Sequence, residues 1–300
     1  MNHLIREIEN IGCAVTPRYP MKKYTWLRVG GEADLVVQPN SNQQFIELLN
    51  LLYSSGVPWV VLGEGSNTIV YDGGVSGVVI STKKLKKVEI VDGTKVLAES
   101  GAILGTILNK TIKAGLTGFE FAAGIPGTVG GGIFMNAGAN EGEIKDVVDT
   151  VWIWTGGEEI ALNRSEIKFE YRKSHLPKGS VIIKAMFSLQ HGCRAQSERN
   201  VKDYMTKRNL TQPIKMSNTG SIFKNPPEIA AGQLIEELGL KGFAIGGAKF
   251  SDLHANFIVN SGNATARDVL ELIETAKREA LLQRGIKLET EVRVIGNEKN

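Results

Sequence analysis

The chain has 300 residues, of which 42% are hydrophobic and 22% are charged, and its formal net charge is +3. Such a chain can fold into roughly two or three domains with hydrophobic cores. Its basic residues are dispersed and no apolar run is long enough to cross a bilayer, so neither a nucleic-acid-binding surface nor a membrane span is predicted.

The first predicted unit covers residues 33–62 and consists of a strand, a helix and a second strand. Ser41 and Gln44 fit a capping box at the start of the helix. Gly56 is typical of a helix end. The apolar segment PWVVLG then predicts a second buried strand, and the order of elements predicts a βαβ unit with parallel strands.

The middle of the chain alternates apolar and polar residues around Asp92-Gly93 and again around Gly156-Gly157, which predicts two strand pairs. The segment ILGTILNKTIKAGLTG lies between them and predicts a helix. A charged helix is expected from about Ala195 onwards.

The last third predicts one strong helix, with Thr265 and Asp268 at its start and Gly285 at its end. The segment KLETEVRVIG predicts a closing strand. The sequence therefore indicates an α+β chain in three parts: a βαβ start, a glycine-rich middle and a C-terminal module.

The chain contains 34 glycines, and one glycine-containing loop, Leu62–Asn67 (LGEGSN), follows the second predicted strand. A Rossmann dinucleotide motif does not fit, because the third glycine is missing and a short β-branched segment follows instead of a helix. A nest of backbone N–H groups that binds an anion and an ordinary turn remain equally open.

A second glycine-rich loop runs from Ala122 to Gly131 (AAGIPGTVGG), and Met135–Ala139 (MNAGA) follows it with Asn136 and another glycine. Two separate loops of this kind suggest a long ligand such as a dinucleotide. Two closely packed turns are the alternative.

Three polar residues carry little information alone. Arg172 lies near a predicted strand end, where an arginine is usually solvated or salt-bridged, and Glu291 lies on the charged face of the last strand. Ser221 follows Gly220 without the G-x-S-x-G pattern of a hydrolase nucleophile, so its spacing favours a turn.

No metal site is predicted, because the four histidines are scattered and neither Cys13 nor Cys193 belongs to a Cys/His cluster. The N-terminal segment MNHLIREIENIG is charged and amphipathic, unlike a secretory signal. A cytoplasmic protein with reduced thiols is therefore expected.

Taken together, six segments in order resemble the MurB-type UDP-N-acetylenolpyruvoylglucosamine reductases, and they span nearly the whole chain. The segments are Tyr24–Gly31, Leu62–Asn67, Gly124–Gly131 with Asn136-Ala137-Gly138, Tyr171–Ser174, Gly220–Pro226 and Glu291–Arg293. The compact spacing resembles the short, type II members, so the residues that clamp the substrate diphosphate are not assigned, and roles for His254 and Asn256 stay open.

The resemblance implies an α+β fold with a two-lobed FAD-binding domain of the vanillyl-alcohol-oxidase (PCMH) type and a C-terminal α+β substrate-binding domain. The first lobe is expected at residues 1–82, the second at 83–206 and the substrate-binding domain at 207–300. For the final strand, residues 291–300, a return to the first lobe is an alternative to a place in the substrate-binding domain.

The resemblance also implies the cofactor and its binding residues. FAD is expected to bind non-covalently, because no histidine lies in the glycine-rich loops. The residues implied to cradle its pyrophosphate or line its flavin are Gly63, Gly65, Ser66, Asn67, Gly127, Thr128 and Gly130.

The implied reaction converts UDP-N-acetylglucosamine enolpyruvate to UDP-N-acetylmuramate for peptidoglycan synthesis, hence for cell-wall formation, cell shape and division. NADPH is the implied co-substrate, and N5 of the reduced FAD gives the hydride. Ser221 is the implied proton donor, Arg172 and Glu291 stabilise the enolate, and Lys224 and Asn225 contact the substrate. A monomer without nucleic-acid or membrane partners is expected.

Two other functions fit parts of the sequence. A flavin oxidase or dehydrogenase of a sugar or alcohol explains the glycine-rich loops but gives Ser221 and Glu291 no task. A non-catalytic nucleotide-binding or flavin-binding module leaves Arg172 without a task as well.

Overall fold

The computed structural model describes residues 2–298. Positions 1, 299 and 300, which belong to the predicted first lobe and last strand, lie outside the described residues. The chain divides into two compact units. The first unit comprises Met1–Pro17, Leu35–Glu64 and Gly77–Lys207; the second comprises Arg18–Asp34, Gly65–Ser76 and Arg208–Asn300. The expected division of residues 1–206 into two lobes stays a prediction.

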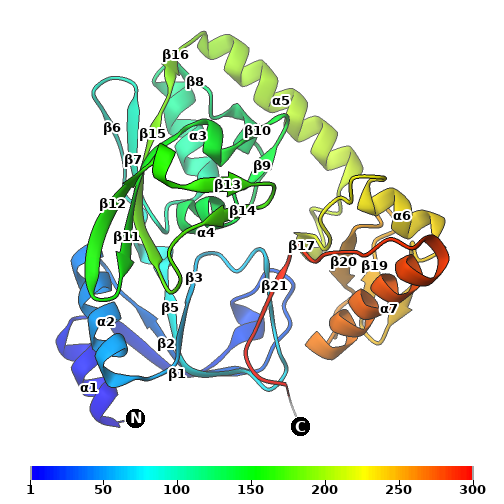
Figure 1. Ribbon diagram of the computed structural model, residues 1–300, viewed down its shortest axis with the longest axis horizontal. Coiled ribbons are helices and arrows are strands. Elements are labelled where there is room, and N and C mark those ends of the chain that lie inside the picture. Colours follow the sequence, from blue (N-terminus) through cyan, green and yellow to red (C-terminus); the bar gives the residue numbers. More distant parts are fainter. Residues whose placement is uncertain (1, 299–300) are drawn as a thin grey trace. The chain divides into compact units, whose positions relative to one another are not determined.

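The predicted strand–helix–strand segment is confirmed and forms part of a four-stranded sheet (Figure 1). The strand order is β1 (Ala14–Pro20), β2 (Glu32–Gln38), β5 (Val75–Ser81) and β3 (Trp59–Leu62). Helices α1 (Asn2–Asn10) and α2 (Asn42–Ser55) add their apolar side chains to a core with β2 and β5. The predicted capping box forms only in part: Ser41 accepts from the N–H of Gln44, but the Gln44 side chain bonds Asn40 instead.

A five-stranded antiparallel sheet forms the second layer of the first unit, in the order β12-β11-β15-β7-β6. Its strands are β6 (Val88–Val91), β7 (Lys95–Glu99), β11 (Val148–Thr155), β12 (Glu158–Asn163) and β15 (Val181–Ser188). Both predicted strand pairs are confirmed. The buried faces of α3 (Leu104–Lys113) and α4 (Val129–Phe134) share its hydrophobic core.

Short strand pairs and most of a long helix, as far as Lys207, complete this unit. The pairs are β8 (Leu116–Thr117) with β16 (Gln190–His191), β9 (Gly138–Ala139) with β10 (Gly142–Glu143), and β13 (Lys168–Glu170) with β14 (Lys173–His175). The predicted charged helix is α5 (Arg194–Thr211).

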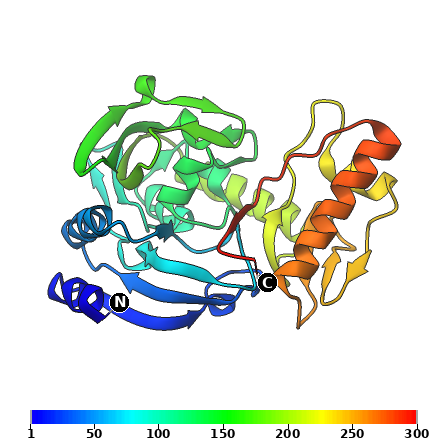
Figure 2. The same cartoon turned by 60° about the horizontal axis from the view of Figure 1, so that its bottom comes forward.

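The second unit has a four-stranded sheet and two helices (Figure 2). The strand order is β17 (Ser217–Ser221), β20 (Phe257–Asn260), β19 (Ala248–Phe250) and β18 (Ala244–Ile245). Helices α6 (Ala231–Glu237) and α7 (Ala266–Arg284) enclose its core, and α7 packs on β18 and β19. The predicted start of α7 is confirmed, because Thr265 and Asp268 form a full capping box.

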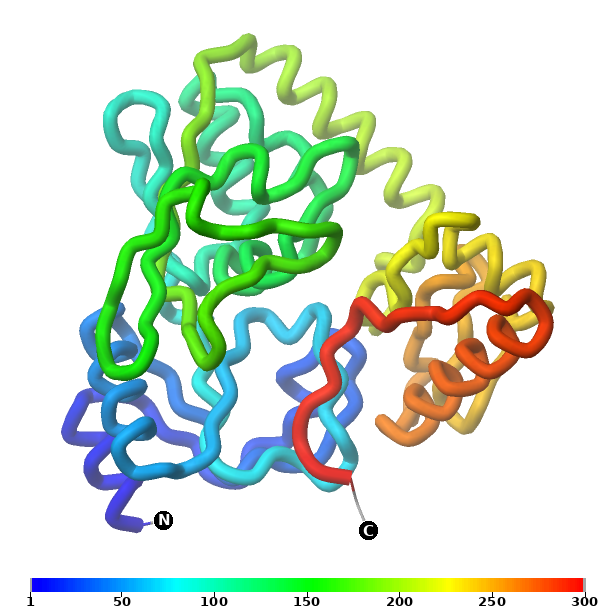
Figure 3. The backbone as a smooth tube through the Cα atoms, in the orientation of Figure 1, coloured from blue at the N-terminus to red at the C-terminus, as the bar shows by residue number. Residues whose placement is uncertain are grey.

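The closing strand is shorter than predicted. Only β21 (Arg293–Ile295) is a strand, and it pairs in parallel with β4 (Thr68–Val70), as the chain trace in Figure 3 shows. Just before β21, Thr290 forms an isolated antiparallel bridge with Phe223, which lies two residues after Ser221. Among residues 2–298, no helix combines the length and apolar character needed to cross a bilayer.

Candidate active site

The first glycine-rich loop connects β3 to β4 and begins at Gly63. A Cβ atom added at Gly63 would overlap the side-chain oxygen of Thr128, which belongs to the second glycine-rich loop. Because the clash is with a side chain that is itself buried, any larger residue at position 63 must displace Thr128. The fold therefore brings one residue from each predicted loop into direct contact.

The second loop leads into α4, and Thr128 caps this helix by accepting from the N–H of Gly131. The N–H of Gly130 donates to the carbonyl oxygen of Ser100 at 2.8 Å, which fixes the loop against the end of β7. The Ser100 hydroxyl is buried and has no hydrogen-bond partner among the described residues. A buried hydroxyl of this kind normally has a partner, such as a water or a ligand.

These features fit a dinucleotide cofactor. Gly127 and Gly130 carry no side chain, and the buried Ser100 hydroxyl next to Gly130 is available to a polar ligand atom. In the second unit, Ser66 is buried, and the side-chain nitrogen of Asn67 donates to the Glu291 carbonyl at 3.3 Å. The predicted cofactor loop is thus bonded to the segment of a predicted catalytic residue.

Arg172 occupies the tip of the β13–β14 hairpin. Glu170 pairs with Lys173, so Tyr171 and Arg172 form a two-residue turn, and Arg172 has a φ of +56°. Its guanidinium carbon lies 5.1 Å from the centre of the Tyr171 ring. At the base of the turn, hydrogen bonds from Lys168 and then from His175 lower the pKa of Glu170 from 4.5 to about 2. The turn therefore combines a strained arginine with an ionised carboxylate.

Ser221 ends β17, directly after Gly220. Gly220 has a φ of +76°, a conformation that costs a glycine little, and the pairing of β17 with β20 is irregular between Asn218 and Ser221. The next residue, Ile222, donates to the Asn256 carbonyl at 2.8 Å, and its own carbonyl accepts from the N–H of Glu291 at 2.8 Å. Ser221 and Glu291 therefore lie on neighbouring segments.

Asn256 holds this segment with its side chain. Its oxygen accepts from the N–H of Phe223 at 2.9 Å, and its nitrogen donates to the carbonyl of Phe223 at 2.8 Å. The amide thus bonds Phe223 as a neighbouring strand would, in a site where Asn256 is 3% exposed. Its own N–H donates to Nδ1 of His254, and burial lowers the pKa of that imidazole.

The two predicted substrate contacts have partners within the protein. The Lys224 ammonium lies 2.7 Å from a carboxylate oxygen of Glu289, and its backbone N–H donates to the Glu289 carbonyl. The side-chain oxygen of Asn225 accepts from the N–H of Ala231 at 3.0 Å, at the start of α6. Lys224 keeps further donors for a ligand, whereas the Asn225 oxygen is partly committed to the helix.

The predicted site residues fall in both units. The second unit holds Ser221, Glu291, Lys224, Asn225, Gly65, Ser66 and Asn67, and the first holds Arg172, Gly63, Gly127, Thr128 and Gly130. The sequence did not point to Ser100, because its position next to Gly130 depends on a contact that only the fold creates. Across the part of the chain that the structure describes, no cluster of potential metal ligands occurs.

Fold and loops together define an FAD-binding oxidoreductase. Residues 33–161 match the family model of the FAD binding domain, and residues 212–295 match that of the UDP-N-acetylenolpyruvoylglucosamine reductase C-terminal domain. The chain belongs to the UDP-N-acetylenolpyruvoylglucosamine reductase family.

Several relatives carry that name. The protein of Clostridium novyi (strain NT) is 42% identical over 93% of this chain and 91% of its own length. The protein of Caldanaerobacter subterraneus subsp. tengcongensis is 43% identical over 92% of each chain. The crystal structure of the Thermus caldophilus enzyme (MurB) superposes with a TM-score of 0.81 at 34% identity, over 94% of this chain and 98% of that one. The predicted family, α+β fold class and FAD cofactor are thereby confirmed.

Proposed function

We propose that this chain reduces the enolpyruvyl ether of UDP-N-acetylglucosamine enolpyruvate to UDP-N-acetylmuramate, with NADPH as the electron donor. Membership of the reductase family supports the overall reaction. The observation that carries the residue roles is the hydrogen bond between Glu291 and Ile222, which sets a carboxylate-bearing segment beside Ser221.

FAD is the group that, when bound, takes hydride from NADPH and passes it to the CH2 carbon of the substrate. We assign its pyrophosphate to Gly63, Gly65, Ser66 and Asn67 and its flavin to Gly127, Thr128 and Gly130. The buried Ser100 hydroxyl, which has no partner among the described residues and lies next to Gly130, supports this assignment.

The protein must then stabilise negative charge on the substrate carboxylate and protonate one carbon. Arg172 suits the carboxylate, because its planar guanidinium can bond two oxygens at once. We propose Ser221 as the proton donor. A hydroxyl is a weak acid, so it needs neighbours that stabilise the alkoxide, and we propose the ammonium of Lys224, three residues further along the chain, for this task.

Glu291 has a supporting role in this scheme. Its backbone is fixed on both sides, by the Asn67 side chain at its carbonyl and by Ile222 at its N–H. A carboxylate on such a fixed segment can orient a water molecule or polarise the intermediate without itself moving. Asn225 and Lys224 are proposed to contact the sugar nucleotide.

The cellular setting extends the same proposal. The reaction supplies a precursor of peptidoglycan, and through it cell-wall formation, cell shape and division. We place the enzyme in the cytoplasm and expect it to act as a monomer, which sedimentation of the purified protein would test.

The overall function can be tested with purified protein. It should be yellow and lose the colour on denaturation, and it should consume NADPH only when the enolpyruvyl substrate is present. Fast turnover of a simple sugar with oxygen, and none of the enolpyruvyl compound, would identify a flavin oxidase instead. Protein that cannot be reconstituted with FAD would contradict both.

A further inference from the structure

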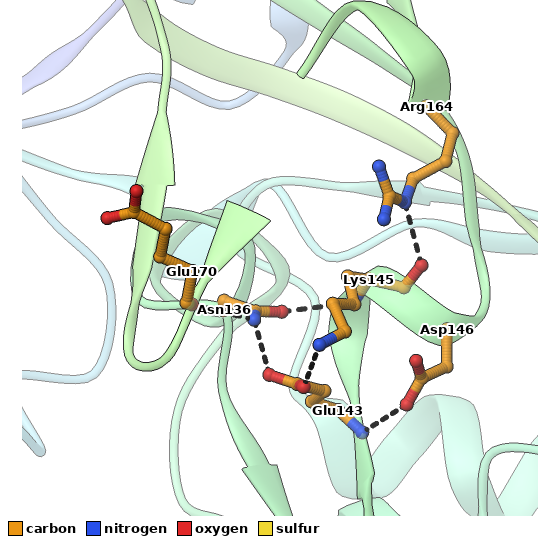
Figure 4. Close-up of polar contacts among 6 residues, drawn as sticks. All are labelled: Asn136, Glu143, Lys145, Asp146, Arg164 and Glu170. Carbon is orange, nitrogen blue, oxygen red and sulfur yellow. Dashed lines mark hydrogen bonds and ion pairs between the residues drawn. The ribbon is translucent and has the colours of Figure 1, made fainter. Parts of the chain in front are cut away.

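Asn136 is a buried polar side chain close to the second glycine-rich loop, and both its amide oxygen and its amide nitrogen are hydrogen-bonded (Figure 4). It is 0% exposed. Its nitrogen donates to the Glu143 carboxylate and to the carbonyl oxygen of Glu170, the latter at 3.0 Å, and its oxygen accepts from the N–H of Lys145 at 3.0 Å. The sequence suggested that this residue adjoins a ligand, but its side chain is turned into the protein.

The bond to Glu170 reaches the hairpin that carries Arg172. Glu170 is the last residue of β13 and directly precedes the two-residue turn of Tyr171 and Arg172. On the opposite strand, the Ser174 hydroxyl donates to the Phe134 carbonyl at 3.0 Å. Both strands of the hairpin are therefore tied to one segment, residues 134–136, at the end of α4.

The backbone conformations of Arg172 and Asn136 agree with this arrangement, because both residues have a positive φ. Arg172 has a φ of +56° and Asn136 a φ of +43°. Asparagine adopts this region comparatively readily, whereas for arginine it is strained and persists only where the surroundings hold it. The hydrogen bonds at Glu170 and Ser174 hold the base of the turn.

We propose that Asn136 is a positioning residue for Arg172: it fixes the carbonyl of Glu170 so that the turn presents the guanidinium in one direction. Residues 134–136 directly follow α4, which begins within the Gly127–Gly130 loop. The hairpin that carries the arginine is therefore bonded to the same stretch of chain as the backbone proposed to line the flavin. This inference rests on the proposed function, because it needs Arg172 to contact the substrate carboxylate.

The test uses a pair of substitutions that cuts one bond only. N136D turns the donor nitrogen into an acceptor, which repels the Glu170 carbonyl but also the Glu143 carboxylate. Adding E143Q restores a donor toward position 136, so N136D/E143Q keeps the Glu143 and Lys145 contacts and loses the one to Glu170. E143Q alone, which leaves Asn136 in place, is the matched control.

The readout separates the two half-reactions of the FAD-loaded enzyme under anaerobic conditions. In N136D/E143Q, flavin reduction by NADPH should be unchanged, and reoxidation by the enolpyruvyl substrate should slow by about 10- to 100-fold. E143Q should change neither. N50A, which removes the partner of the Trp154 indole nitrogen elsewhere in the first unit, should lower thermal stability but leave both half-reactions intact.

Combination with R172A distinguishes positioning from general damage. If Asn136 acts through Arg172, the triple variant should reoxidise no more slowly than R172A alone. A loss that adds in full to that of R172A, or an equal slowing of both half-reactions, would overturn the inference. If N136D/E143Q does not fold, S174A, which cuts the second tie, takes its place with the same expectations.

Failure of the proposed function and failure of the positioning role give different experimental results. If R172A itself leaves reoxidation intact, the proposed role of Arg172 is wrong. If R172A slows reoxidation but N136D/E143Q and S174A do not, the proposed function stands and the positioning role of Asn136 is wrong.

Discussion

The N–H of Glu291 donates a hydrogen bond to the carbonyl oxygen of Ile222 at 2.8 Å. This bond joins residues far apart in the chain and places the proposed proton donor, Ser221, one residue from the partner of Glu291. The side chain of Asn67 donates to the Glu291 carbonyl, so the cofactor loop joins the same network. Changes in any of these segments should therefore affect the second half-reaction.

Gly63 should be intolerant of a side chain. G63A forces Thr128 away from the cap of α4, so we expect weaker FAD binding and a paler purified protein. G105A is the matched control, because a Cβ atom added at Gly105 in α3 meets no atom within 4 Å, and alanine there should be neutral or stabilise by up to about 1 kcal/mol. Full FAD occupancy in G63A, measured by flavin absorbance per protein, would refute this.

Asn256 should be needed for stability as well as activity. N256A leaves the N–H and carbonyl of buried Phe223 without partners, which should lower the free energy of unfolding by about 2–4 kcal/mol. N263A, at an exposed position of the same unit, should change it by less than about 0.5 kcal/mol. Urea denaturation of both variants checks this, and equal midpoints for N256A and wild type would contradict it.

Glu120 predicts a pH dependence of stability. Burial alone would raise the pKa of its carboxyl, but hydrogen bonds from Ser197, Thr117 and the N–H of Gly118 outweigh burial and lower the pKa below 4.5. The folded state therefore favours the ionised form. Its stabilising contribution is present above pH 4.5 and is lost as the pH falls through the lowered pKa of the folded state.

E120Q tests this directly. At neutral pH it should be less stable than wild type by about 1.5–3 kcal/mol, because it loses charge-assisted hydrogen bonds. The difference should shrink as the pH falls below 4.5. Unfolding free energies measured across this range would contradict the account if the difference stayed constant.

The two cysteines should differ in reactivity. Burial, and then the charge of Glu47, raise the pKa of the Cys13 thiol to about 11, whereas Cys193 is exposed. A thiol reagent at neutral pH should therefore label Cys193 in the native protein and Cys13 only after denaturation. C193S, which should remain unlabelled until unfolded, is the control; rapid labelling of native C193S would show that Cys13 is accessible.

Local signals in the sequence predicted what local interactions determine. Thr265, Asp268 and Gly285 predicted the limits of α7, because capping depends on neighbours within one turn. The closing strand was predicted too long, because alternation continues through residues that bridge to the Phe223 segment rather than join a sheet. Periodicity does not tell which partner a strand meets.

The site was only partly predictable for the same reason. Family resemblance gave Ser221, Arg172 and Glu291, whereas their spacing alone favoured a turn and solvent-exposed strand faces. Contacts such as Gly63 with Thr128, or Asn136 with Glu170, join residues that are distant in sequence. The glycine-rich surroundings of Asn136 suggested a ligand-binding loop. Such surroundings do not reveal which way a side chain points, and that of Asn136 bonds to other parts of the protein.

The central claim is that Ser221 gives the proton to the substrate carbon, and anaerobic stopped-flow measurements of S221A test it most directly. The account predicts that NADPH reduces the flavin of S221A at nearly the wild-type rate, because Ser221 takes no part in that step. Reoxidation by the enolpyruvyl substrate should be slower by a factor of at least about 100. Reoxidation of S221A at the wild-type rate would contradict the account.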